Sequence, residues 1–297
     1  MKRTNKVKKV VIPIAGLGTR MLPATKAIPK EMLPISGKPI IQHIIEESFL
    51  AGFKEAIFVT HSSKYSVENH FDKSFELEAT LKKRVKRSLL KEIKAISKLD
   101  IEIHSVRQGE ARGLGHAVLC AESIVGDEPF AVILPDMIIQ GADINSNLSF
   151  MKKAFEDNKI SSILLDKVQR KEVSEYGIVK LKRMKESNFS GLVEDIIEKP
   201  SISKAPSNLI VAGRYMFPNE FFKHLSRIKP DKNDEIQLTD AIYSFIKDGN
   251  AVNGCLLNGT LHDCGNKLGY LKANIEYAIE DKSISKQFIN YLRKIKV

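Results

Sequence analysis

Near the N-terminus an apolar stretch leads directly into small residues and then into two cations, a combination suited to binding a polyphosphate. Residues 15–20 read Ala-Gly-Leu-Gly-Thr-Arg, and Lys30 follows in the next segment. Small residues let the backbone approach a ligand closely, and successive N–H groups can form a concave anion site. Arg20 and Lys30 would supply the positive charge that phosphate oxygens require. The alternative is an ordinary glycine-containing turn with two surface charges.

Two common phosphate-binding motifs do not fit this turn. The dinucleotide fingerprint G-x-G-x-x-G requires a glycine at position 21, where this chain has Met21. The Walker A loop requires Gly-Lys-Ser or Gly-Lys-Thr after the glycines, and neither follows here. The turn therefore belongs to neither of these nucleotide-binding classes.

Two aspartates stand where apolar runs end, which makes them candidate metal ligands. Asp136 ends the apolar run 130–135, and Asp263 follows an apolar run that ends at Leu261. Open α/β sheets bind ligands outside the carboxyl ends of their strands. Mg²⁺ favours one or two carboxylates together with substrate phosphates. On local pattern alone, Asp136 could instead cap a helix and Asp263 could form a turn.

A second group of polar residues could bind a sugar and a base. Glu198 and Lys199 end another predicted strand, and a carboxylate can accept hydrogen bonds from neighbouring hydroxyl groups. Gln108 has an amide that can both donate and accept, which suits the imide edge of uracil. Gly113 would let the backbone come close to that base. Taken alone, Lys199 reads as a surface charge, and Gln108 and Gly113 read as turn residues.

The elements that must position these residues alternate between apolar strands and amphipathic helices. That alternation predicts a doubly wound α/β domain with right-handed crossovers. We expect a domain over residues 7–266 and a helical extension of it over residues 267–297. The predicted strands cover residues 9–15, 56–60, 101–106, 130–134, 161–168, 177–181, 192–198, 209–216 and 251–257. The predicted helices cover residues 40–51, 77–97, 116–123, 148–158 and 238–247.

The composition is that of an ordinary globular protein, with 43% hydrophobic and 28% charged residues. The net charge of +11 comes from residues 1–9 and 282–297, each with five basic and no acidic side chains, and from residues 80–99, which carry +7. The remainder of the chain carries −6. Since no nucleic-acid motif is present and Trp is absent, we expect no nucleic-acid partner. We expect the segment 77–97 to form one amphipathic helix packed by a single face.

Cysteine content and hydropathy bear on location. The cysteines, Cys120, Cys255 and Cys264, have no C-x-x-C spacing and are too few for a disulfide framework, which favours the cytoplasm. No apolar run approaches the roughly 20 residues that a membrane span needs. Pro13 and Arg20 interrupt the N-terminal apolar stretch, so we expect neither a signal peptide nor a membrane partner.

The segment 16–30 matches G-x-G-T-R-x-x-P-x-T-x-x-x-P-K and so resembles the sugar-1-phosphate nucleotidyltransferases. The resemblance is closer to the bacterial UTP–glucose-1-phosphate uridylyltransferases, which have Ala where thymidylyltransferases usually have Gly. Ala15 follows the uridylyltransferase pattern. Further similar strings follow in the same order, at residues 59–63, 83–87, 106–109, 113–118, 133–136, 198–200, 234–241 and 262–270.

This resemblance implies a fold, a reaction and a set of roles. The fold would be the nucleotide-diphospho-sugar transferase fold, a Rossmann-like, mixed and mostly parallel sheet with helices on both faces and a C-terminal helical tail. The reaction would be UTP + glucose 1-phosphate ⇌ UDP-glucose + pyrophosphate, with Mg²⁺ as cofactor and a homodimer or homotetramer as the assembly. The implied metal ligands are Asp136 and Asp263, and the implied catalytic cations are Arg20, Lys30 and Lys199. The implied nucleotide contacts are Ala15, Gly16, Gly18, Glu31, Gln108 and Gly113, and the implied sugar contacts are Gly177, Glu198 and Gly213.

Two alternative functions remain open at this point. A glucose-1-phosphate thymidylyltransferase would use the same chemistry with a different pyrimidine. A non-catalytic regulatory paralogue would bind UDP-glucose without turning it over. Retention of the five charged residues speaks against the paralogue, namely Arg20, Lys30, Asp136, Lys199 and Asp263.

Overall fold

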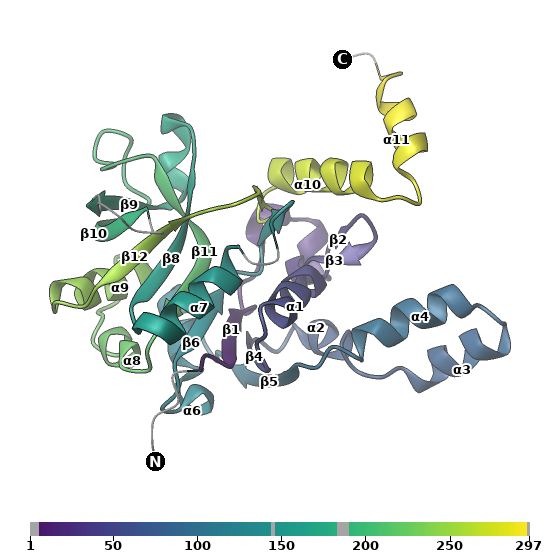
Figure 1. Cartoon of the computed structure of the whole chain (residues 1–297), viewed down its shortest axis with the longest axis horizontal. Coiled ribbons are helices and arrows are strands. Elements are labelled where there is room, and N and C mark those ends of the chain that lie inside the picture. Colours follow the sequence, from purple (N-terminus) through teal and green to yellow (C-terminus); the bar gives the residue numbers. More distant parts are fainter. Residues whose placement is uncertain (1–5, 144–145, 183–189, 296–297) are drawn as a thin grey trace.

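A nine-stranded mixed sheet runs through the molecule in the order β5-β4-β1-β6-β11-β8-β12-β10-β9 (Figure 1). The computed structural model describes residues 6–143, 146–182 and 190–295. Pairing is parallel from β5 to β6 and between β8 and β12, and antiparallel at the other neighbours. In sheet order, the strands are Glu102–Arg107, Glu55–Thr60, Lys9–Pro13, Phe130–Ile133, Leu209–Phe217, Ser161–Lys167, Val252–Leu256, Gly191–Glu198 and Gly177–Lys182.

Helices cover both faces of this sheet because its central strands are apolar on both sides. In β1, Val11 packs into one hydrophobic cluster, while Val10 and Ile12 pack into the other. One face carries α5 (Gly113–Leu119), α6 (Glu122–Val125), α8 (Phe221–Leu225) and α9 (Leu238–Lys247). The opposite face carries α1 (Ile40–Leu50), α2 (Tyr65–Asn69) and α7 (Leu148–Asn158). The predicted mixed α/β sheet with helices on both faces is confirmed, but it is not mostly parallel, because four of its eight neighbouring strand pairs are antiparallel.

Two small antiparallel pairs were not predicted. Strand β7 (Met137–Gln140) pairs with β13 (Thr260–Asp263), and β2 (Pro34–Ile35) pairs with β3 (Lys38–Pro39). In the first pair Asp263 lies opposite Met137, and the N–H of Cys264 donates to the carbonyl of Asp136 at 2.7 Å. This pairing brings the two aspartates to one place. The short 3₁₀ helices η1 to η4 are Thr19–Met21, Ala24–Lys26, Lys30–Met32 and Arg170–Glu175.

The basic segment 77–97 differs from its prediction. It forms two helices, α3 (Phe75–Lys83) and α4 (Arg87–Ile96), which pack against each other and extend away from the sheet (Figure 1). The chain reverses at Val85, whose φ of 55° lies in the left-handed region. Neither helix has a fully buried residue, and the half-buried apolar residues Leu81, Leu90, Ile93 and Ile96 replace the single packed face that was expected. We call this hairpin, residues 75–96, the arm.

The C-terminal part of the chain is helical, as predicted. Helix α10 (Lys267–Glu280) begins with an Asn266 cap, whose side chain accepts from the N–H of Gly269 at 2.9 Å, and α11 (Ser285–Leu292) follows it. The boundary at residue 267 between the expected domain and its extension stays a prediction. Across the described ranges, every helix is too short or too polar to cross a bilayer.

Candidate active site

A cavity of about 490 Å³ opens at the end of the sheet where β1 and β6 finish. The strand β1 leads into residues 15–20, and β6 leads into Asp136, so both segments meet at this edge. The predicted residues in the lining are Ala15, Gly16, Gly18, Arg20, Lys30, Gln108, Gly113, Asp136, Gly177, Glu198, Lys199 and Asp263. Two predicted residues, Glu31 and Gly213, are not in the lining.

The turn after β1 depends on glycine at one position. Gly18 has a φ of 67°, and a Cβ there would lie 3.2 Å from Thr25 Cγ2 and 3.3 Å from Lys30 Cβ. The hydroxyl of Thr25 donates to the carbonyl of Gly18 at 2.7 Å, which fixes the turn against the next segment. By contrast, a Cβ on Gly16 would meet nothing within 4 Å. The backbone at Gly16 is therefore open to a ligand.

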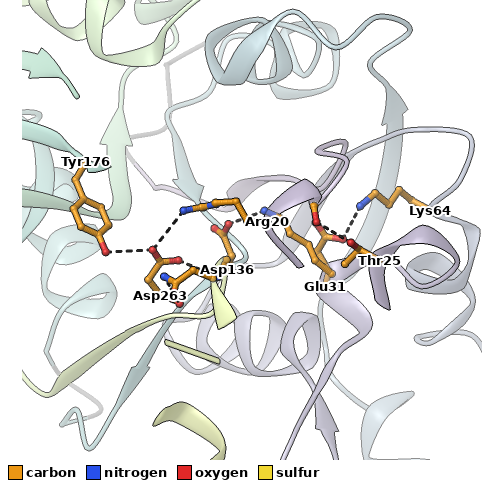
Figure 2. Close-up of polar contacts among 11 residues, drawn as sticks. Arg20, Thr25, Glu31, Lys64, Asp136, Tyr176 and Asp263 are labelled. Atoms are coloured by element: carbon orange, nitrogen blue, oxygen red, sulfur yellow. Dashed lines mark hydrogen bonds and ion pairs between the residues drawn. The ribbon is translucent and has the colours of Figure 1, made fainter. Parts of the chain in front are cut away.

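Oppositely charged side chains face each other across the cavity floor (Figure 2). Lys30 Nζ lies 2.6 Å from Asp136 Oδ2, and Arg20 Nη1 lies 3.9 Å from Asp263 Oδ2. The hydroxyl of Tyr176 donates to Asp263 Oδ2 at 3.2 Å. Each aspartate thus lies near a cationic side chain, and its carboxylate oxygens can still accept further hydrogen bonds.

The same two carboxylates share one small space above Gly265. A Cβ on Gly265 would lie 2.8 Å from Asp136 Oδ2, 3.0 Å from Asp263 Oδ1 and 2.7 Å from Arg20 Nη2. Any larger residue there would separate the two carboxylates. Two carboxylate oxygens that converge on one space are a donor set that suits Mg²⁺, since this ion completes its shell with water and substrate oxygens.

The Lys30–Asp136 pair is held in its charged form. Burial alone would raise the pKa of Asp136, but the ammonium of Lys30, with which it is hydrogen-bonded, and the charge of Arg20 keep that pKa below its usual value. Burial alone would lower the pKa of Lys30, but the carboxylates of Asp136 and Glu31 raise it above the usual value. Both groups are therefore ionised at neutral pH.

Glu31 lies behind the cavity wall. Its side chain is 1% exposed and pairs with the equally buried Lys64 at 2.8 Å (Figure 2). Burial raises the pKa of Glu31, while the charges of Lys64 and Lys30 oppose that shift. The structure therefore pairs Glu31 with Lys64 and does not bring it into the cavity with the other predicted nucleotide contacts.

Gly213 also lies behind the wall, where it permits two strands to approach. Its φ is 75°, and a Cβ there would lie 2.9 Å from Met137 Sδ and 3.0 Å from Leu134 Cβ. The carbonyl of Gly213 accepts from the N–H of Leu134 at 2.8 Å. Gly213 thus lets β11 pass close to the segment that carries Asp136.

Arg214, next in β11, was not predicted as a site residue. Its side chain is fully buried, and Nε donates to Glu47 Oε1 at 3.1 Å while Nη1 donates to the carbonyl of Met137 at 2.5 Å. A charged residue inside the apolar run 209–217 was the sequence signal for it. Arg214 fixes the backbone immediately after Asp136.

The part of the cavity that was predicted to contact a sugar is built by β9, β10 and the residues that flank them. A Cβ on Gly177 would lie 3.1 Å from Thr239 Cγ2 and 3.2 Å from Glu198 Oε2, so only glycine leaves this corner open. Burial raises the pKa of Glu198, and the charge of Lys199, with Nζ 3.8 Å from Oε1, opposes that shift. Tyr176, which precedes Gly177, also lines the cavity and was missed as a site residue.

The part of the cavity that was predicted to contact a base is formed by Gln108 and the start of α5. Gln108 is 5% exposed, and its backbone N–H donates to the carbonyl of Thr60 at 2.9 Å. Gly113 has a φ of 87°, and a Cβ there would lie 2.8 Å from the carbonyl oxygen of Ile236. The close packing of α5 against Ile236 therefore requires glycine at this position.

Known proteins resemble this chain over almost its whole length. The family model described as "Nucleotidyl transferase" matches residues 9–280. A UTP–glucose-1-phosphate uridylyltransferase from Haemophilus ducreyi is 48% identical over 97% of this chain and 98% of its own length. The enzyme of the same name from Escherichia coli K12 is 49% identical over 97% of this chain and 96% of its own length.

Solved structures agree with these relatives. A UTP-bound UGPase from Acinetobacter baumannii superimposes with a TM-score of 0.90 at 42% identity and covers 98% of this chain and 100% of its own. A UDP-glucose pyrophosphorylase complexed with UDP-glucose gives a TM-score of 0.83 at 39% identity over 92% of this chain and 99% of its own. This chain belongs to the nucleotidyl transferase family, within its branch of UTP–glucose-1-phosphate uridylyltransferases.

Proposed function

We propose that this enzyme makes UDP-glucose and pyrophosphate from UTP and glucose 1-phosphate, the reaction after which its relatives are named. One observation carries the proposal for this chain. A single cavity collects the cations Arg20, Lys30 and Lys199 and the carboxylates Asp136 and Asp263 from segments far apart in the sequence. Such a set of charges matches two phosphorylated substrates and a metal ion.

The reaction joins two anions, so charge repulsion and alignment dominate its barrier. Arg20 and Lys30 bind the triphosphate of UTP, and Lys199 binds the phosphate of glucose 1-phosphate. An oxygen of that phosphate attacks the α-phosphorus of UTP in line, and the bond to the pyrophosphate breaks. No protein nucleophile is required, because a phosphate dianion is already nucleophilic.

Asp136 and Asp263 would hold Mg²⁺, which when bound neutralises charge on the phosphate oxygens. Lys30 contacts Asp136 at 2.6 Å and lies in the same cavity lining, so it can transfer its hydrogen bond from the carboxylate to an arriving phosphate oxygen. The hydroxyl of Tyr176 restrains Asp263 in the orientation that faces the shared space above Gly265.

We assign the two organic groups of the substrates to different parts of the lining. Gln108 and Gly113 contact the uracil, and the backbone at Ala15, Gly16 and Gly18 follows the nucleoside and its phosphates. Glu198 accepts hydrogen bonds from glucose hydroxyl groups beside the open corner at Gly177. Glu31 and Gly213 do not line the cavity, and we infer that they position neighbouring residues that do.

Assembly and location complete the proposal. The resemblance supports a homodimer or homotetramer. All three cysteines are free thiols, which suits a reducing cytoplasm.

A coupled pyrophosphate-release assay with UTP, glucose 1-phosphate and Mg²⁺ tests this function. We expect turnover by the wild type and loss of nearly all turnover in Asp136→Ala with an unchanged far-ultraviolet circular dichroism spectrum. Pyrophosphate release by Asp136→Ala at the wild-type rate would refute the assigned ligand. A higher kcat/KM for dTTP than for UTP would instead indicate a thymidylyltransferase, and binding of UDP-glucose without turnover would indicate a regulatory paralogue.

A further inference from the structure

The side-chain amide of Gln108 is held on two sides by neighbouring acceptors. Its Nε2 lies 3.1 Å from the carbonyl oxygen of Gly113 and 3.0 Å from Nδ1 of His116. A carbonyl oxygen can only accept a hydrogen bond, so the group that faces Gly113 must be the NH₂ of the amide. The second hydrogen of that NH₂ is then directed to His116.

This arrangement also fixes the state of the His116 ring. Since the amide nitrogen is only a donor, Nδ1 of His116 must be an acceptor, and the ring proton must be on Nε2. Burial lowers the pKa of His116 and the charge of Arg112 lowers it further, which keeps the ring neutral at pH 7. The required tautomer is thus compatible with the surroundings of the ring.

With both N–H groups engaged, Gln108 can offer only its Oε1 to a ligand. Uracil presents an N3–H donor between two carbonyl oxygens, whereas cytosine presents an N3 acceptor beside its amino group. An unrestrained glutamine amide could turn over and present N–H to cytosine instead, because it has a donor and an acceptor of similar shape. Orientation of the amide therefore decides whether this glutamine distinguishes the two pyrimidines.

The groups that hold the amide are themselves rigidly placed. Gly113 and His116 are three residues apart in α5, so they share one face of that helix. The N–H of Gly115 donates to the carbonyl of Ile236 at 2.8 Å, which anchors the start of α5. The backbone of Gln108 is anchored in turn through Thr60 at the end of β4.

We propose that His116 is a specificity-determining positioning residue that locks the Gln108 amide, so that the enzyme accepts uracil nucleotides and rejects cytosine nucleotides. The inference rests on the proposed function, in which Gln108 contacts the base. His116 itself acts through Gln108. Substrate selection of this kind arises when a fixed polar group would face a partner of the same type in the wrong ligand.

The test compares kcat/KM for UTP and CTP, with glucose 1-phosphate and Mg²⁺ constant, in two variants. His116→Leu removes the acceptor, and we expect the UTP-to-CTP ratio to fall about 3- to 10-fold, the loss expected for one hydrogen bond. His116→Asn keeps an acceptor, because Asn Oδ1 branches from Cγ as His Nδ1 does. We expect this variant to retain most of the wild-type ratio.

Two further variants distinguish failure of the proposed role of His116 from failure of the proposed contact between Gln108 and the base. Leu119→Ala, also in α5 but partly buried in the core, should lower the Tm and leave the ratio unchanged. An unchanged ratio in His116→Leu, or an equal fall in His116→Leu and His116→Asn, overturns the role of His116. An unchanged ratio in Gln108→Leu shows instead that the assignment of Gln108 to the base, part of the proposed function, is wrong.

Discussion

The cavity and the arm use charge in opposite ways. In the cavity, Lys30 and Asp136 lie 2.6 Å apart, with side chains only 17% and 16% exposed. In the arm, Lys94 of α4 lies 3.9 Å from Glu78 of α3, and the Lys94 side chain is 45% exposed. Water screens exposed pairs strongly and sheltered pairs weakly. The Lys30–Asp136 pair of the cavity is therefore expected to contribute far more than the Lys94–Glu78 pair of the arm.

The largest effect that this comparison predicts is the loss of Lys30. Lys30→Gln removes the charge that we assign to the triphosphate and leaves Asp136 without its close partner. We expect kcat/KM in the pyrophosphate assay to fall by about a thousandfold, as for other removals of a fixed group that stabilises developing charge. Lys26→Gln is the matched control, because Lys26 is exposed and outside the cavity lining. A Lys30→Gln enzyme within threefold of wild type would break the comparison.

The next largest effect concerns the fully buried Arg214, which pairs with Glu47 and holds the backbone after Asp136. Arg214→Met leaves Glu47 and the carbonyl of Met137 without their donor, and we expect the free energy of unfolding to fall by about 3 kcal/mol in urea titrations. Arg227→Met, at an exposed position, should change stability by less than about 0.5 kcal/mol. Equal free energies of unfolding for the two variants would mean that the buried position of Arg214 does not increase its contribution to stability.

A pH series extends the comparison to His43, a half-buried histidine of α1. Burial lowers the pKa of His43 to about 4, with a further contribution from Lys38 that Glu46 opposes. Between this pKa and the ordinary value, His43 is protonated in the unfolded state but not in the folded state. The free energy of unfolding therefore falls as the pH drops from about 6.5 towards 4. Between pH 7 and pH 5 this one group should cost about 2 kcal/mol.

His43→Phe should remove that part of the acid sensitivity and keep the contact with Tyr277, where the two rings now meet edge to face at 4.9 Å. Urea unfolding at pH 7 and pH 5 measures the difference. His61→Phe serves as a comparison at a partly exposed histidine. If the His43→Phe and wild-type proteins lose the same free energy of unfolding between pH 7 and pH 5, a group other than His43 causes the loss of stability in acid.

The smallest effect is expected in the arm. Lys94→Gln removes one side of the pair with Glu78, and the free energy of unfolding should change by less than about 0.5 kcal/mol because the Lys94 side chain is exposed and its Nζ lies 3.9 Å from Glu78 Oε2. The pyrophosphate assay should give wild-type turnover. A loss above about 1 kcal/mol would show that arm charges are more strongly coupled than their exposure indicates.

The sheet was largely predictable because its central strands are continuous apolar runs. The pair β7 and β13 was not, since each has four residues and three of the four in Thr260–Asp263 are polar, so periodicity gives little signal. Their pairing joins segments far apart in the chain, which no local pattern can indicate. The reversal at Val85 was missed for a related reason, because β-branched valine is unexpected at positive φ and no Gly or Pro marks the turn.

Some residues of the candidate site could likewise be predicted from the sequence, and others could not. Motifs selected Arg20, Lys30, Asp136 and Asp263, because chemistry-bearing residues at strand ends are visible in sequence. Arg214 and the pairing of Glu31 with Lys64 depend on which buried charges meet in the folded chain. Residue types alone do not determine such contacts.

The β7–β13 pairing has a consequence for how the enzyme is made. Asp136 is followed at once by β7, but the partner strand β13, which ends at Asp263, is translated only after the whole segment 141–259. Contacts between such distant segments form late, since a long loop must close first. A nascent chain could thus assemble the turn at residues 15–20 and the base side well before its second carboxylate arrived. On the proposed function, the site is therefore complete only after residues 260–263 have been synthesised and have paired with β7.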